Sequence, residues 1–177
     1  MKKILFLFLP ILLNLNCSSQ LKSIDRKVNQ IEKQITKKNI KKNDYSDHTK
    51  FELSEIIYAT KIGTEIVKIN YEIVENENYS NYNRKCQIYL KKSVPIFITE
   101  IISGKQTIYF SGINKVTKEP ANQMDMEFAI NNKIYVENWK KFEIDVIGSS
   151  KKNDYNLKSK EEYEKIINKV LKQETKK

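Results

Sequence analysis

The chain is poor in the residues from which most catalytic sites are built. Its 177 residues include only four glycines, two cysteines, one histidine and one tryptophan. So few glycines leave little scope for loops that cradle phosphates, and none of the common nucleophile, metal or nucleotide-binding signatures is present. The two cysteines, Cys17 and Cys86, give neither a disulfide framework nor a metal-binding spacing. We therefore expect no enzymatic activity, no metal and no cofactor.

Arginine is also scarce, although the chain is basic, with 32 lysines and arginines against 22 acids and a net charge of +10. Arg26 and Arg84 are the only arginines. Because bidentate recognition of phosphate and guanine favours arginine, we do not expect a nucleic-acid partner. A surface rich in scattered lysines can still bind polyanions in a salt-dependent way. The single histidine, His48, lies in a polar stretch with no second group to fix it as a catalyst or ligand.

Long hydrophobic runs are missing as well. The main apolar run, Ile4 to Leu13, follows Lys2 and Lys3. It is too short for a helix that crosses a bilayer, which needs roughly 20 residues. A positive charge, a short apolar segment and then a processing site is the order of an export signal. Residues 1–16 are therefore predicted to be a signal peptide.

Cys17 ends this segment at the distance where bacterial lipoproteins carry their acylated cysteine. The residues before it resemble the loose lipobox of spirochaete lipoproteins, with Asn14 and Asn16 at the positions usually held by a large aliphatic and a small residue. The resemblance implies a lipid on Cys17, and two acyl chains are enough for stable membrane attachment. Ordinary cleavage after Ser19, which would release a secreted protein, is the alternative.

The residues after Cys17 are predicted to form a helical tether and a linker, together residues 17–50. Apolar residues recur at alternating spacings of three and four, as in a heptad repeat: Leu21, Ile24, Val28, Ile31 and Ile35. The segment resembles the start of the murein-type lipoprotein coiled coil, but it is shorter than the three to four heptads that define one. It can serve as a tether, pack on the domain or self-associate weakly. Residues 36–50 lose all periodicity and are interpreted as a linker.

Residues 51–177 are predicted to form one α+β domain. Phe51 to Thr60 is ambiguous, and its apolar spacing favours a short helix. From Ile62 onward apolar residues alternate, with a slip at Val67-Lys68 that indicates a β-bulge. Alternation continues through 85–92, 96–102, 106–110, 124–130, 133–137 and 142–146, with turns predicted at 93–95, 103–105 and 131–132 and loops at 75–84 and 111–123. This succession predicts an antiparallel β-meander of about seven strands.

The C-terminal residues carry the clearest helix signal. Ser159 and Glu162 have the spacing of a capping box. The apolar residues that follow share one helical face: Tyr163, Ile166, Ile167, Val170 and Leu171. We expect this stripe to pack on the sheet, because strands with one apolar face need a second layer.

The predicted loop 75–84 is the first candidate for ligand binding. It is rich in tyrosine, asparagine and serine, which are common in recognition loops, and we name Tyr79, Tyr82 and Arg84 as candidate contacts. The loop 111–123 is the second candidate. Asp125 and Glu127 alternate with apolar residues, which places them on the solvent face of a strand, and Cys86 is expected to be a buried apolar residue.

Several of these features resemble one group of bacterial surface proteins. The leader with CSSQ, the Lys/Asn/Ile bias and the lysine-tipped helical C-terminus are similar to borrelial plasmid-encoded surface lipoproteins, and the layout resembles the EppA/BapA exported antigens. This resemblance implies an outer-surface antigen with no known enzymatic activity.

From these features we expect a non-enzymatic binding module, lipid-anchored on the outer membrane and exposed to a host or vector protein or a polyanion. The alternative is a structural envelope or periplasmic lipoprotein, forming a weak homo-oligomer through Leu21–Ile35. A secreted hydrolase is nearly excluded, because the chain lacks the residues for hydrolysis.

Overall fold

The computed structural model describes residues 5–46, 55–77, 80–113, 120–148 and 157–175. The chain divides into two compact units, Met1–Lys41 and Lys42–Lys177. The first unit contains helix α1 (Leu5–Lys37), and the second contains seven strands and helix α2 (Lys160–Glu174). Among the described residues, no helix has both the length and the apolar character needed to span a membrane.

Helix α1 includes every position of the predicted heptad pattern, Leu21 to Ile35. It ends where Asn39 takes a left-handed conformation, with φ of 46°. The amide of Asn39 then donates to the carbonyl of Thr36, and the amide of Ile40 donates to that of Ile35. This is a Schellman motif, in which asparagine takes the position usually held by glycine.

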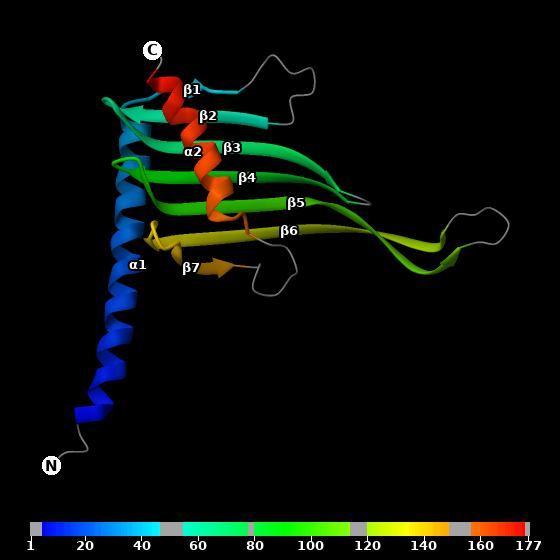
Figure 1. Cartoon of the computed structure of the whole chain (residues 1–177), viewed down its shortest axis with the longest axis horizontal. Helices are drawn as coiled ribbons and strands as arrows, with labels where there is room; N and C mark the ends of the chain where they lie inside the picture. Colours follow the sequence, from blue (N-terminus) through cyan, green and yellow to red (C-terminus); the bar gives the residue numbers. More distant parts are fainter. Residues whose placement is uncertain (1–4, 47–54, 78–79, 114–119, 149–156, 176–177) are drawn as a thin grey trace. The chain divides into compact units, whose positions relative to one another are not determined.

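The strands form one antiparallel sheet in chain order (Figure 1). Their bounds are β1 Lys42–Asp44, β2 Glu55–Ile62, β3 Glu65–Glu77, β4 Ser80–Lys91, β5 Val94–Ile113, β6 Pro120–Asn138 and β7 Glu143–Gly148. With α2 lying across this sheet, the predicted α+β meander with a C-terminal helix is confirmed.

The predicted strand count is correct although several assignments are wrong. The segments predicted as 96–102 and 106–110 are both parts of β5, and those predicted as 124–130 and 133–137 are both parts of β6. Two strands that we did not predict, β1 and β2, restore the count. The helix predicted in 51–60 is wrong, because Glu55–Ile62 is a strand paired with β3 on one side and with β1 on the other.

Two predicted turns lie inside these long strands. Gly104, predicted in a turn, is paired with Tyr82 of β4 and Phe128 of β6. Asn132, predicted in a hairpin, is paired with Glu100 of β5 and Gly148 of β7 and is buried. Glycine and asparagine favour turns locally, but pairing with neighbours on both sides keeps these residues in extended strands.

Other local predictions are confirmed or need only a small shift. Thr60 of β2 pairs with Lys68 and Lys61 pairs with Ile66, so Val67 is the extra residue of the predicted bulge. The turn predicted at 93–95 begins one residue earlier, because Lys92 and Ser93 both have positive φ between the paired ends of β4 and β5.

The predicted linker also needs correction. Strand β1 lies within 36–50, and Tyr45, directly after it, is only 1% exposed. The Tyr45 amide donates to the Ile57 carbonyl at 2.8 Å, and its hydroxyl donates to Glu174 at the end of α2. The second unit therefore begins at Lys42, ahead of the predicted boundary at residue 51. His48 lies outside the described residues.

Helix α2 covers one face of the sheet, as predicted. Ser159 and Glu162 form the capping box, and the helix buries the predicted residues Tyr163, Ile166, Ile167 and Val170, with Leu171 partly buried. They pack against a cluster from six strands or their flanks that includes Tyr45, Ile57, Ile69, Ile88, Ile98 and Ile134. Each fully buried side chain of this size contributes about 1.5–3 kcal/mol of transfer free energy.

Candidate functional site

The predicted recognition loop is mostly strand. Strand β3 extends to Glu77 and β4 starts at Ser80, so the two strands form a long hairpin. Tyr82 and Arg84 lie in β4 and are only 5% and 8% exposed. Tyr79 falls outside the described residues. The interpretation of 75–84 as a loop is therefore wrong, and neither Tyr82 nor Arg84 offers a free side chain to a macromolecular partner.

Tyr82 has a packing role that the sequence did not reveal. A Cβ atom built on Gly104 would lie 2.3 Å from the carbonyl oxygen of Asn81 and 2.6 Å from the Cα of Tyr82. The close approach of β4 therefore requires glycine at this position. Tyr82 and Phe128 lie on either side of Gly104 in register, with ring centroids 6.3 Å apart. The two rings supply the packing that the glycine lacks, as aromatic neighbours do for glycines in designed sheets.

Strands β5 and β6 continue beyond their neighbours as a two-stranded ribbon (Figure 1). On one face of the ribbon, Met124 and Met126 are 45% and 41% exposed. On the other face, Thr107 donates to Asp125 at 2.8 Å and Lys105 pairs with Glu127 at 3.2 Å. Asp125 and Glu127 are both exposed, as predicted. The ribbon thus has one apolar and one charged face, both open to solvent.

The outer edge of this ribbon lacks a partner strand in the described part of the chain. Strand β7 pairs with β6 only from Asn132 to Asn138, and Pro120–Asn131 of β6 pairs with β5 alone. An open edge presents unpaired backbone groups that can accept a further strand. We refer to Pro120–Asn131 as the open edge of β6.

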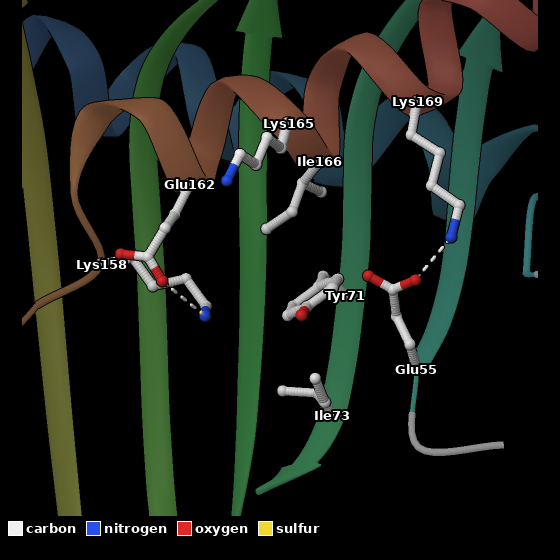
Figure 2. Close-up of a pocket in the computed structure, with 8 residues that line it drawn as sticks. All are labelled: Glu55, Tyr71, Ile73, Lys158, Glu162, Lys165, Ile166 and Lys169. Carbon is white, nitrogen blue, oxygen red and sulfur yellow. Dashed lines mark hydrogen bonds and ion pairs between the residues drawn. The ribbon is translucent and has the colours of Figure 1, made fainter. Parts of the chain in front are cut away.

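A cleft of about 360 Å³ lies between α2 and the sheet. Its walls are formed by Glu55, Tyr71, Ile73, Lys158, Glu162, Lys165, Ile166 and Lys169. In Figure 2, a Lys158–Glu162 pair stands at one end and a Glu55–Lys169 pair at the other, with Tyr71 and Ile73 between them. Lysines 165 and 169 and the apolar Ile166 come from the same helix. Because sequence spacing does not show which strands lie beneath a helix, this cleft was not predicted.

The surroundings of Glu162, at one end of the cleft, favour its ionised form. Lys158 is only 7% exposed, and its ammonium lies 3.4 Å from Glu162 Oε1 and 5.5 Å from the centroid of the Tyr71 ring. Partial burial alone would raise the pKa of Glu162, but the Ser159 amide and the Lys158 charge lower it below its ordinary value. A carboxyl group with a lowered pKa is a poor general acid at neutral pH.

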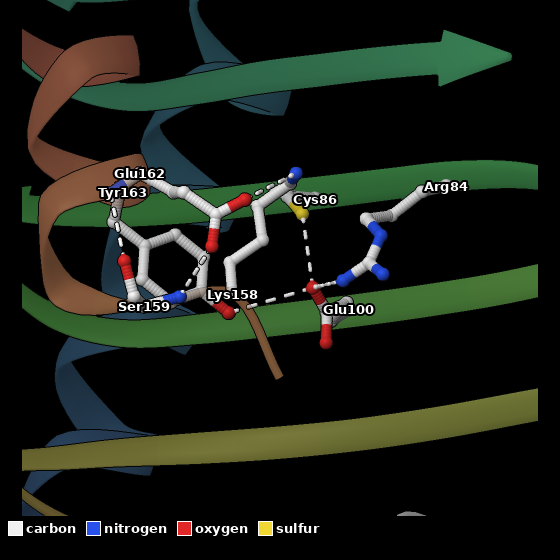
Figure 3. Close-up of polar contacts among 7 residues, drawn as sticks. All are labelled: Arg84, Cys86, Glu100, Lys158, Ser159, Glu162 and Tyr163. Carbon is white, nitrogen blue, oxygen red and sulfur yellow. Dashed lines mark hydrogen bonds and ion pairs between the residues drawn. The ribbon is translucent and has the colours of Figure 1, made fainter. Parts of the chain in front are cut away.

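A buried polar network lies beside this cleft (Figure 3). Glu100 is fully buried, and its Oε1 accepts from Arg84 Nη1 at 2.9 Å. The same oxygen lies 3.7 Å from Cys86 Sγ and 3.5 Å from the Tyr163 hydroxyl, which comes from α2. The network therefore ties β4, β5 and α2 together around one carboxylate.

This environment makes Cys86 unreactive. The thiol is 1% exposed, as predicted, and burial together with the neighbouring Glu100 charge raises its pKa. Burial and the same carboxylate also raise the pKa of Tyr163. Because the thiolate is the nucleophilic form, Cys86 is unsuited to covalent catalysis. Among the described residues, no cluster of His, Cys, Asp and Glu could hold a metal ion.

Cys17, the predicted lipid attachment residue, lies within α1. Comparisons of the chain with protein-family models, curated proteins and solved structures found no match.

Proposed function

We propose that the chain is a non-enzymatic binding module, attached to the outer membrane through a lipid on Cys17 and exposed outside the cell to a host or vector macromolecule. The leader supports the location. The open edge of β6 carries the binding proposal, because a free edge beside an exposed apolar face is the geometry of strand addition. The raised pKa of Cys86 and the lowered pKa of Glu162 fit a role without catalysis.

The charges along the open edge indicate the kind of partner. Met124, Met126 and Phe128 share one face, and Asp125 and Glu127 share the other. An added strand that alternates apolar and basic residues would complement both faces. Self-pairing of two copies about Met126 would place Asp125 opposite Glu127, which is unfavourable because like charges repel across paired strands. We therefore propose an extended segment of a different protein as the partner.

Charge reversal tests this surface. The full chain, displayed on cells, would be used to capture proteins from host and vector extracts, with bound proteins identified by mass spectrometry. The double substitution Asp125→Lys/Glu127→Lys should abolish capture of the specific partner. The control Glu137→Lys/Glu143→Lys changes the net charge by the same amount at exposed positions away from the open edge, and should leave capture unchanged. Equal behaviour of the two variants would contradict strand addition and favour binding of a polyanion.

Protease treatment of intact cells tests the location. An exposed protein should be digested while periplasmic markers survive. Protection of the chain until the outer membrane is permeabilised would contradict the surface assignment and favour an envelope role.

The structural envelope role has its own supporting observation. Helix α1 runs without interruption through the heptad positions Leu21 to Ile35, and lipid anchoring would concentrate such helices at a membrane. Analytical ultracentrifugation of chains beginning at Gln20 and at Lys42 distinguishes the two roles. Association of the longer chain alone would support self-assembly through α1, and identical monomers would argue against it.

A further inference from the structure

The cleft under α2 combines a cationic wall with an apolar floor. Three lysines and two glutamates line it. Two of the lysines are paired, Lys158 with Glu162 and Lys169 with Glu55. Lys165 has no ion-pair partner among the described residues, so one positive charge of the lining is left uncompensated. A single anionic group would balance it.

The apolar part of the lining restricts the ligand further. The Tyr71 ring and Ile166 are buried, and Ile73 is half-buried beside them. In Figure 2 these three side chains lie between the two ion pairs, with Lys165 on the helix side. A simple inorganic anion would satisfy Lys165 and leave the exposed part of Ile73 uncovered. An anion that carries an apolar group would meet both requirements.

The cleft is large enough for a small ligand and has a buried ammonium group, that of Lys158, in its wall. A volume of 360 Å³ is at the small end of the range for ligand pockets, roughly 300–1,000 Å³. Lys158 is held at the cleft by Glu162 and by the face of the Tyr71 ring, so its charge is positioned before any ligand arrives. Fixed charges of this kind strengthen anion binding because the protein pays little ordering entropy.

We propose that this cleft binds a small carboxylate with an apolar body, whose carboxylate lies against Lys165 and Lys158 and whose apolar body covers Ile73 beside the edge of the Tyr71 ring. The proposal is independent of the open edge of β6, because the cleft is formed by other strands and by α2. Failure of either proposal leaves the other standing.

Hydrocinnamate and its uncharged amide form a matched pair of probes. Binding to the full chain in lipid nanodiscs would be measured by ligand-observed NMR, with empty nanodiscs subtracted. Hydrocinnamate should bind roughly tenfold or more tightly than the amide, since a charged hydrogen bond contributes about 1.5–3 kcal/mol. It should also bind roughly tenfold more tightly than acetate, which lacks the apolar body. Equal binding of acid and amide would overturn the proposal.

Two substitutions on α2 test the role of the uncompensated lysine. Lys165→Met should remove most of the difference between the acid and the amide. Lys172→Met removes the same charge from an exposed position of the same helix that does not line the cleft, and should keep the difference. Equal losses in both variants would show that net charge, and not the cleft, attracts the probe.

A third substitution tests the floor of the cleft. Ile73→Trp should fill it and abolish hydrocinnamate binding, with an unchanged circular dichroism spectrum and urea midpoint showing that the fold is intact. Full retention of binding in this folded variant would place the probe elsewhere and overturn the proposal.

Discussion

Glu100 is the residue on which the polar interior of the second unit depends. It is fully buried and accepts a hydrogen bond from Arg84, which is only 8% exposed. Its second oxygen, Oε2, accepts no hydrogen bond from the described residues. Removing two charges from water is costly, and the attraction between them repays this cost only partly. The pair therefore constrains how β4 and β5 pack and adds little net stability.

Burial of this ion pair predicts different responses to a single and to a double substitution. Glu100→Gln should destabilise the fold by about 3–5 kcal/mol, because it removes the charged half of a buried ion pair and weakens the bond that Arg84 Nη1 donates to this side chain. The measurement is urea unfolding of the second unit followed by circular dichroism, with the slope of the transition checked for a change in the denatured state.

The double substitution Arg84→Met/Glu100→Leu is the control. It removes both charges together and should recover most of the stability lost in the single variant. A double variant that unfolds as easily as Glu100→Gln would show that the network stabilises the fold through more than the compensation of its own charges.

At the scale of single elements, α2 was predicted correctly because its signals are local. The capping box and the apolar stripe occupy consecutive turns of one helix, so no other segment is needed to recognise them. Strand β2 was missed because its apolar spacing also fits a helix, and pairing on both sides decides the outcome. The cleft under α2 was missed for a related reason: Tyr71 and Ile73 are far from Lys165 in sequence.

The buried network could be anticipated only in part. The alternation around Cys86 predicted correctly that its side chain faces the core, and the same alternation places Arg84 on that face. The asparagine and serine residues of 75–84 are typical of loops, and they led to the prediction of a loop in spite of this alternation. Glu100 lies among apolar residues with no sign in the sequence that Arg84 is its neighbour across the sheet.

The capping box of α2 gives a prediction at this scale. Ser159 Oγ accepts from the Glu162 amide at 3.3 Å, and Glu162 Oε2 accepts from the Ser159 amide at 2.7 Å. Ser159→Ala should cost about 1 kcal/mol, the usual penalty for losing an N-cap side chain. Urea unfolding at neutral pH measures it, and an unchanged midpoint would mean that the box does not stabilise α2.

The same box predicts a pH dependence. The folded pKa of Glu162 lies below its ordinary value of 4.5. Its contribution to stability is therefore present above that ordinary value and is lost as the pH falls through the lowered folded pKa. Glu162→Gln should flatten this part of the stability profile, measured as urea midpoints from neutral to acidic pH. A variant profile as steep as that of the parent would assign the acid sensitivity to other carboxylates.

For the whole molecule, the sequence predicted three parts, 1–16, 17–50 and 51–177, whereas the structure divides into two compact units, Met1–Lys41 and Lys42–Lys177. The stretch 36–50 is polar and has no period, which is why it was interpreted as a linker. A three-residue strand such as β1 is too short to show a period. Burial of Tyr45 and its bonds to Ile57 and Glu174 depend on contacts with distant parts of the chain.

The boundary can be tested with two fragments. One begins at Lys42, where the second unit starts in the structure, and the other begins at Phe51, where the sequence predicted the start of the domain. The shorter fragment lacks β1 and Tyr45, and loss of a large buried aromatic side chain costs about 3–5 kcal/mol. It should therefore have a much lower urea midpoint or fail to fold. Tyr45→Ala in the longer fragment separates the side chain from the strand, and it should account for most of the loss. Removing a strand and an aromatic ring that belong to the core must lower the stability. Equal urea midpoints for the two fragments would therefore show that β1 and Tyr45 are not part of the core, and that the second unit begins at Phe51.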